Sequence, residues 1–157
     1  MAENELALTP ANANPWYVLM TLYGEQDREE VDGALQEKNR AAWNAWSCQA
    51  MEDAAREAAA VTSEVTVAEL AAWPARQAEV TELHKAEMLR RNGEGFVYPG
   101  LPDAADMVHM GRVAFELRLV MDKAVFSGDA GFDSATFSGE AWFDSATFSG
   151  DASFFSA

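Results

Sequence analysis

Few residues in this chain could do acid–base or metal chemistry. His84 has Glu87 three positions later, a spacing that puts both side chains on one face of a helix. Such a pair can form a surface ion pair or half of a metal site, but no second ligand pair stands at a matching interval. We expect His84 at the surface beside a carboxylate, and the other histidine, His109, pointing outward. The sequence therefore predicts no catalytic, cofactor-binding or metal site.

Nucleophilic and phosphate-binding motifs are also missing from the sequence. The single cysteine, Cys48, excludes an internal disulfide and any site built from several thiolates. It stands in a helical stretch near Trp46, which favours an inert, packed thiol. Gly93 and Gly95 lack the following lysine and serine that a phosphate loop needs. The sequence therefore predicts a protein that is not an enzyme, with an unknown activity in the helical part as the enzymatic alternative.

The composition is strongly acidic. The 157 residues include 26 acidic and 11 basic side chains, for a formal net charge of −15. A field of this sign repels nucleic-acid phosphates and anionic lipids, so we expect neither direct nucleic acid binding nor membrane insertion. The first fifteen residues have no basic start or apolar run of the signal-peptide type, and a cytoplasmic location is the simplest expectation.

Capping signals predict a helical domain over residues 15–92. Side chains that accept hydrogen bonds from a helix N-terminus recur there, each just before a stretch with helical periodicity. The signals are Asn14 with Pro15, Asp27 with Glu30, Thr66 with Glu69, and Pro74 with Gly93 at the far end. They predict helices at 16–22, from Asp27 to about 61, at 66–73 and at 74–91.

Two segments flank this domain. Residues 1–14 have the composition of a loose N-terminal arm, and residues 93–107, rich in glycine and proline, of a linker. Trp43 and Trp46 lie three positions apart on one helix face, and we assign them to the core of the helical domain rather than to a partner-binding surface.

From Ala124 the chain is written in near-identical units of eleven residues. The units are AVFSGDAGFDS, ATFSGEAWFDS and ATFSGDASFFS. Each contains Ala-x-Phe twice, so the phenylalanines follow one another in alternating steps of six and five residues. They are Phe126, Phe132, Phe137, Phe143, Phe148 and Phe154.

This pattern resembles the pentapeptide-repeat family, in which a small residue stands two positions before a bulky apolar one. The resemblance implies a right-handed, four-sided β-helix in which four faces make one coil, with small and bulky side chains inside. Common members carry leucine at the bulky site and keep a strict period of five, whereas this chain uses phenylalanine and alternates five with six.

The alternation extends backward through less regular sequence. Counting back from Phe126 reaches Met121, Phe115 and Met110 at the bulky sites, and Leu119, Val113 and Val108 at the small sites. All six are apolar, while charged residues such as Arg118 fall at outward positions. The pattern predicts an α+β fold, in which a small α-helical N-terminal domain precedes and caps a short β-solenoid over residues 108–157.

A coil of 22 residues places side chains 22 positions apart about 4.8 Å from each other, as in neighbouring strands. The phenylalanines then form stacked columns, and alanine at the small sites leaves room for them. Gly128, Gly139 and Gly150, each after a serine, are expected at corners of the coil.

The last coil has an open edge, and this predicts how the protein works. Phe148 and Phe154 lie on adjacent columns of this edge, and Phe155 stands where the preceding units have Asp133 and Asp144. Loss of a charge at an open edge removes a feature that discourages strand pairing. We predict a scaffold that works through protein–protein contact here, with a second copy as the partner in a homodimer.

A regulatory alternative follows from the resemblance. Some proteins that this repeat resembles are acidic rods that occupy the DNA site of a type II topoisomerase and protect it. Residues 108–157 hold seven acidic and three basic side chains, so residues 1–107 carry −11 of the net charge of −15.

Overall fold

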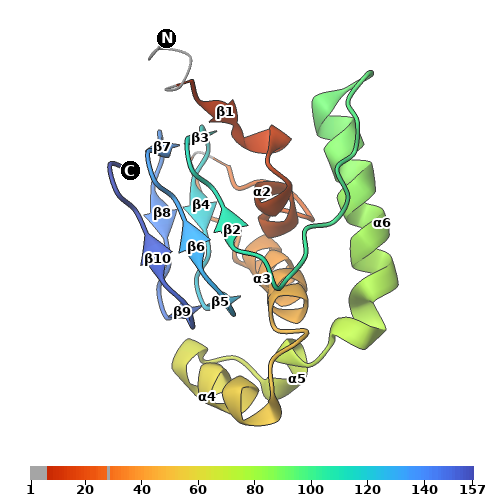
Figure 1. The fold of residues 1–157 in the computed structure, drawn as a ribbon, viewed down its shortest axis with the longest axis vertical. Helices are drawn as coiled ribbons and strands as arrows, with labels where there is room; N and C mark the ends of the chain where they lie inside the picture. The colour runs from red at the N-terminus through yellow and green to blue at the C-terminus, as the bar shows by residue number, and fades with distance from the viewer. Residues whose placement is uncertain (1–6, 28) are drawn as a thin grey trace.

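The computed structural model describes residues 7–27 and 29–157, so residues 1–6 of the predicted arm lie outside the described part. The helical elements are η1 (Ala11–Ala13), α2 (Pro15–Met20), α3 (Gly33–Ser47), α4 (Asp53–Ser63), α5 (Val67–Leu70) and α6 (Trp73–Asn92). The strands are β1 (Thr9–Pro10), β2 (Val108–His109), β3 (Val113–Phe115), β4 (Leu119–Val120), β5 (Val125–Phe126), β6 (Ala130–Gly131), β7 (Thr136–Phe137), β8 (Ala141–Trp142), β9 (Thr147–Phe148) and β10 (Ala152–Ser153). In Figure 1, α2 and α3 lie between the stacked strands and α6.

Several helix ends form where their capping residues predict. The side chain of Asn14 accepts a hydrogen bond from the backbone N–H of Trp16 at 2.9 Å, and Pro15 takes the first helical position. The hydroxyl of Thr66 accepts from the N–H of Glu69 at 3.1 Å. At the end of α6, Gly93 adopts a φ of 79°, a conformation that glycine reaches without strain.

The long helix predicted from Asp27 to about residue 61 is wrong. Asp32, rather than Asp27, caps α3, and the helix stops at Ser47. The guanidinium of Arg56, on α4, donates to the carbonyl oxygens of Cys48 at 3.0 Å and Gln49 at 3.1 Å. These bonds satisfy carbonyl groups where α3 ends, so the chain can turn and lay α4 against β9.

The strands from β2 onward form the predicted solenoid. These strands, together with β1, pair in parallel in four sheets. The strand orders are β1-β3-β7, β2-β6-β10, β4-β8 and β5-β9. Residues 22 positions apart face each other in the registers of β2 to β10, as in Val108 with Ala130 and Ala130 with Ala152. The four sheets are the four faces expected of the coil, which confirms the α+β fold with a helical N-terminal part.

Residues 9–13 correct the prediction of a loose arm. Strand β1 extends the β3 face, with Thr9 opposite Val113, and the N–H of Thr9 donates to the carbonyl of Arg112 at 2.8 Å. The 3₁₀ turn η1 follows directly. The prediction failed because the partner of this segment lies about 100 residues away, beyond any local signal.

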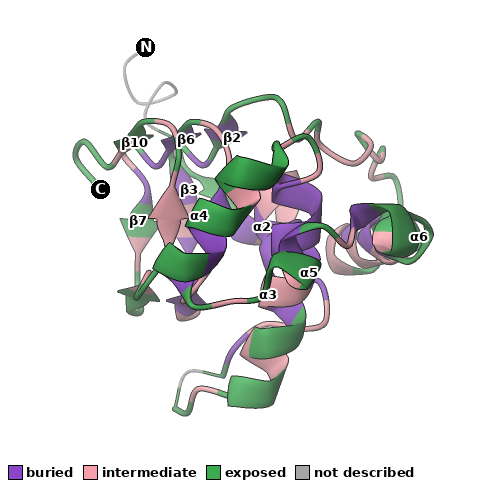
Figure 2. Cartoon of the chain, turned by 90° about the horizontal axis from the view of Figure 1, so that it is seen from below, coloured by how far each residue is buried: buried purple, intermediate pink, exposed green. Residues whose placement is uncertain are grey.

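One buried cluster joins the helices to the solenoid. The ring of Tyr17, on α2, meets Phe115 edge-on at 5.6 Å, and Trp43, on α3, lies 5.2 Å from Phe126. The indole N–H of Trp43 also donates to the carbonyl of Val125 at 3.1 Å. Figure 2 shows this buried band between α2, α3 and the strands. The helices therefore cover the beginning of the solenoid, and the tryptophan pair belongs to the core. Both agree with the prediction.

The segment 93–107 contains no helix or strand, but it packs against the rest of the protein. The indole N–H of Trp46 donates to the carbonyl of Pro102 at 3.0 Å, and Leu101 and Ala104 contact the core cluster. The predicted linker therefore lies against the helices that cap the solenoid.

Candidate interaction surface at the outermost coil

The bulky inward side chains stack in columns through the solenoid. We call residues 114–135 the inner coil and residues 136–157 the outermost coil. Three ring pairs with 22-residue spacing are nearly parallel, at centroid distances of 4.6–4.8 Å. They are Phe115 with Phe137, Phe126 with Phe148, and Phe132 with Phe154. In the fourth column, Met121 precedes Phe143, as the register of β4 and β8 requires. The predicted columns are confirmed.

Burial falls along each column toward the outermost coil. Met110, Phe115, Met121 and Phe126 are all at most 3% exposed, which confirms the backward extension of the repeat. In the outermost coil Phe137, Phe143 and Phe148 are only partly buried, and Phe154 is 41% exposed. Each fully buried ring contributes on the order of 2 kcal/mol of transfer free energy, so the outermost rings realise only part of that stabilisation.

The corners of the coil are of two kinds. At one kind, Ser134 and Ser145 adopt φ values of 60° and 58°, in tight turns closed by backbone hydrogen bonds. At the other stand the repeat glycines, which need no positive φ. A Cβ on Gly139 would lie 3.2 Å from the backbone nitrogen of Arg118, in the coil beneath. Glycine is therefore favoured at this position by close contact between coils rather than by the turn.

Aspartates at the corners accept hydrogen bonds from the next coil. Each uses a carboxylate oxygen to accept from the backbone N–H of the residue 22 positions later, at 2.8–3.0 Å. The pairs are Asp122 with Asp144, Asp129 with Asp151, and Asp133 with Phe155. Burial raises the pKa of Asp122, and the nearby charge of Asp144 adds to this rise. These acids therefore hold successive coils in register in addition to facing solvent.

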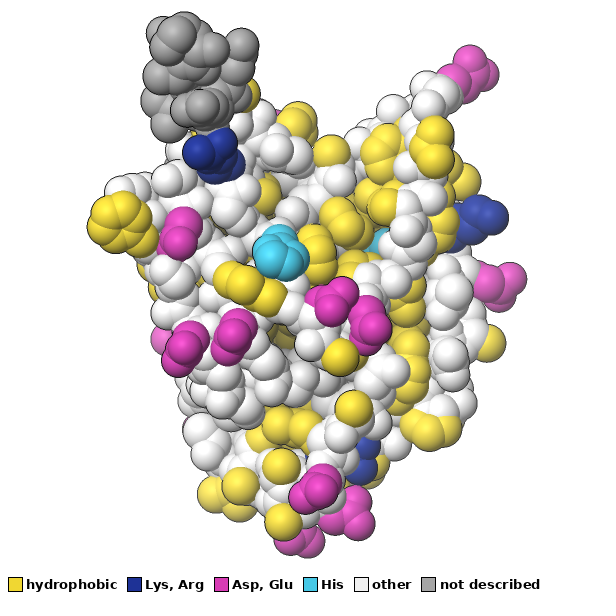
Figure 3. Space-filling view, viewed as in Figure 1, with side chains coloured by type: hydrophobic (Ala, Val, Ile, Leu, Met, Phe, Trp, Pro, Cys, Tyr) yellow, Lys and Arg dark blue, Asp and Glu magenta, His cyan; other side chains and the backbone are white. Residues whose placement is uncertain are grey.

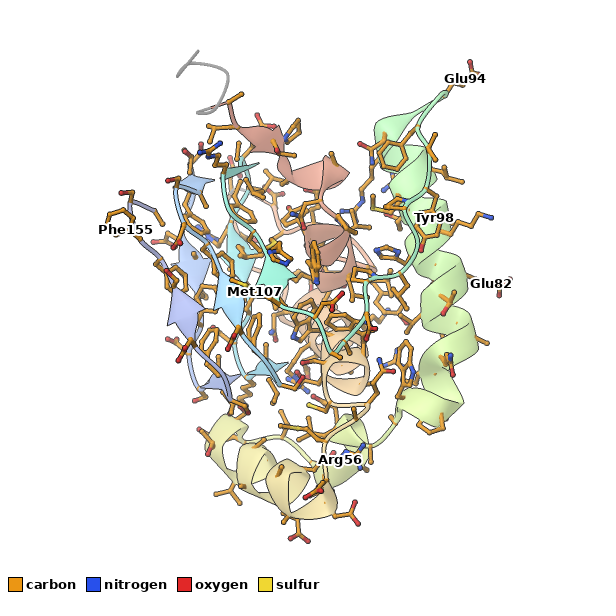
Figure 4. The ribbon with its side chains drawn as sticks, viewed as in Figure 1. Arg56, Glu82, Glu94, Tyr98, Met107 and Phe155 are labelled. Carbon is orange, nitrogen blue, oxygen red and sulfur yellow. The ribbon has the colours of Figure 1, made fainter. Side chains whose placement is uncertain are left out.

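The structure places the predicted interface residues differently from one another. Phe148 and Phe154 both contact Phe143, at 5.9 and 5.8 Å between ring centroids, so the three rings form one aromatic end. Phe155 takes no part in it. Its backbone N–H is bonded to Asp133, and its side chain, 77% exposed, points away from the coil at the left edge of Figure 4.

Sequence reasoning missed Phe143 as a member of this surface. The ring lies between Phe148 and Phe154, and its place in the alternating steps of five and six was the available signal. The apolar side chains at the left edge of Figure 3 mark the outermost coil, and acidic side chains lie on the face beside it.

The comparison with protein families agrees with this geometry. Residues 111–157 match the family model described as "Pentapeptide repeats (9 copies)". These residues are a pentapeptide-repeat segment. Strand β2 extends the stack back to Val108, where the sequence pattern placed its beginning. No curated protein and no solved structure matches the chain. A match of this kind supports a scaffold of a protein-interaction type.

Arg118 lies at its predicted outward position in the pentapeptide-repeat segment, but it is partly covered there. Its side chain is only 18% exposed, because the guanidinium lies over the ring of Trp142 at 5.5 Å. Glu140 approaches it at 3.4 Å. The ring of Trp142 therefore covers the side chain of Arg118 at the outer face through a cation–π contact. The repeat pattern does not predict this contact.

His84 contradicts the prediction of a surface histidine paired with Glu87. The ring is fully buried, with Nε2 2.9 Å from the carbonyl oxygen of Pro15 and Nδ1 2.6 Å from the hydroxyl of Tyr98. Because a carbonyl only accepts, Nε2 carries the proton, and the neutral ring accepts from Tyr98 at Nδ1. Burial lowers the pKa of His84. Glu87 instead binds Arg90 and Arg91.

His109 and Cys48 agree with their predictions. His109 is exposed on the outer face of β2, where its ring lies 5.4 Å from Trp16. Cys48 is buried, and burial raises the pKa of its thiol to about 12, so it stays protonated and unreactive.

Within residues 7–27 and 29–157, no group of three or more histidine, cysteine or acidic side chains could hold a metal ion. No helix in this part of the chain is long and apolar enough to cross a membrane.

Proposed function

We propose that this protein is a non-enzymatic scaffold whose outermost coil binds another protein chain. The observation that carries the proposal is the aromatic end of that coil, where Phe143, Phe148 and Phe154 are only partly covered; the next residue in the chain, Phe155, is 77% exposed outside it. Strands β7, β8, β9 and β10 each pair on one side only among the described residues, so their other edges can accept strands.

The proposed partner is a second copy of the chain, related by a two-fold axis. A self-complementary patch buries its apolar rings against the same rings of the copy. The outermost coil carries Glu140, Asp144 and Asp151 and no basic residue, so a homodimer brings acids of both copies together. Salt screens such repulsion, and we expect the dimer to tighten as the salt concentration rises. We place this activity in the cytoplasm, in line with the single cysteine.

Light scattering coupled to size-exclusion chromatography tests the proposal. We expect a dimer for the 157-residue chain, and Phe155→Asp should weaken it by at least about tenfold, since burying an unpaired charge at an interface is costly. Val97→Asp is the matched control. Val97 is 84% exposed in the segment before the solenoid, so the same change there should leave the dimer intact. A monomer at high concentration would contradict the homodimer.

The acidic topoisomerase-protecting mimic is the alternative proposal. A supercoiling assay with a type II topoisomerase, with and without the protein, separates the two, because a scaffold of the proposed kind leaves the supercoiling rate unchanged. A rate that responds to the protein would favour the mimic.

A further inference from the structure

A groove, which we call the α3–α6 groove, runs along one face of α6, away from the outermost coil, and α3 lines its first part only. It consists of two adjoining hollows of about 450 and 760 Å³ that share Tyr23 and Glu79. The first is also lined by Glu37, Lys38, Ala41 and Arg76, and the second by Glu82, Leu83 and Ala86. In Figure 1, α6 lies on the side of the helices opposite β10. The dimerisation proposed for the outermost coil does not use this groove.

The floor of the groove is apolar and held in place. Ala41 and Ala86 are small, and Leu83 is partly buried against the core cluster. The ring of Tyr23 lies where the two hollows meet. Its hydroxyl donates to Glu79 at 2.6 Å and accepts from Arg76 at 2.9 Å. Because both bonds are made within the protein, Tyr23 offers the groove its fixed ring face rather than a free hydroxyl.

The rim favours a basic partner. Arg76 and Glu79 are bonded to Tyr23, which leaves Glu37, Glu82 and Lys38 as the remaining charged side chains of the lining. Glu82 points outward from α6 in Figure 4. The groove also lies in the part of the chain that carries −11 of the net charge of −15, and a field of this sign attracts basic segments over a longer range.

The shape favours a helix. Alanines at a helix surface let another helix approach closely, and a hydrophobic groove along a helix face can receive the apolar stripe of an amphipathic helix. We propose that the α3–α6 groove binds an amphipathic helix of another protein, with its apolar stripe on Ala41, Leu83 and Ala86 and lysine or arginine side chains toward Glu37 and Glu82.

This second site is independent of the outermost coil. A scaffold with both sites joins its own copy at one end and a basic helix at the other. Helix binding in this groove extends the proposed interaction function. A chain that does not dimerise could still bind the helix, and a chain with a blocked groove could still dimerise.

Nuclear magnetic resonance of the full ¹⁵N-labelled chain tests the inference. The probe is a synthetic peptide with leucine at helical spacing and lysine at its other positions, and the control peptide has glutamate in place of lysine. We expect saturable shifts of the amides of Tyr23, Ala41, Leu83 and Ala86 with the lysine peptide, and none with the glutamate peptide.

Matched substitutions on α6 separate the groove from general charge attraction. Ala86→Arg fills the groove and should weaken binding by about tenfold or more, as expected for a central contact. Ala75→Arg, on the same helix outside the two hollows, adds the same charge and should change the affinity much less. Equal weakening by both substitutions, shifts scattered over the acidic surface, or no saturable binding would overturn the inference.

Discussion

The two ends of the solenoid contain the same repeat but are completed differently. At the near end, Tyr17 and Trp43 cover the first rings, and β1 extends the β3 face. At the far end, the same columns finish in rings that are partly covered or exposed. The comparison shows that the repeat builds stacked columns of side chains but does not cover the first and last side chains of each column. The stability of a short stack therefore depends on what covers its terminal coils.

The largest difference between the ends is expected in stability. Trp43→Ala removes the ring against Phe126 and the hydrogen bond to Val125, and should lower the free energy of unfolding by about 3–5 kcal/mol. Phe148→Ala removes a partly exposed ring stacked on Phe126 and should cost roughly half as much, about 2 kcal/mol. Urea unfolding followed by circular dichroism measures both. Equal losses would show that the outermost coil is covered in solution.

Contact between coils gives the next effect. A Cβ on Gly150 would lie 2.6 Å from the carbonyl carbon of Gly128, whereas a Cβ on Gly128 meets nothing within 4 Å. Gly150→Ala should therefore destabilise the protein by about 1–3 kcal/mol through overpacking. Gly128→Ala, the matched control, should be neutral or stabilise it by roughly 0.4–1 kcal/mol. Thermal melts compare them, and identical melting temperatures would show that the outermost coil can shift away from the inner one.

The smallest effect concerns the helical layer that covers the near end. Burial lowers the pKa of His84, so the unfolded chain binds the proton more tightly than the folded one. The contribution of the neutral ring is fully present above the unfolded pKa of about 6.5, and it is lost as the pH falls toward the lowered folded value.

Between those two values, stability should fall by at most about 1.4 kcal/mol per pH unit. Urea midpoints measured at pH 7.5 and 5.5 should therefore differ more for the native chain than for His84→Gln, which cannot take up the proton. The same difference in both proteins would assign the pH dependence to other groups.

Much of the solenoid could be predicted because its determinants are local and repeated. The alternating steps of five and six residues place Met110 and Phe115 inside the solenoid, and both are at most 1% exposed. The candidate surface was partly predictable for the same reason, since Phe148 and Phe154 follow the columns. Phe143 was overlooked although it follows the same rule.

The errors share one physical cause, which is contact between residues distant in the chain. Thr9 pairs with Val113, and His84 is buried by Pro15 and Tyr98 rather than exposed beside Glu87. The long helix ends at Ser47 because Arg56 binds the carbonyls that follow. Capping and periodicity describe neighbours within a few residues and contain no information on these partners.

The sequence by itself determined the repeat, its 22-residue coil and the helix caps at Asn14 and Thr66, because periodicity and side-chain type over a few residues control each of these. Only the tertiary structure decided which side chains cover the near end of the solenoid, why a side chain on Gly139 would crowd the neighbouring coil, and where the α3–α6 groove lies. Those features arise when distant segments approach within a few ångströms, and packing of that kind depends on the whole chain at once.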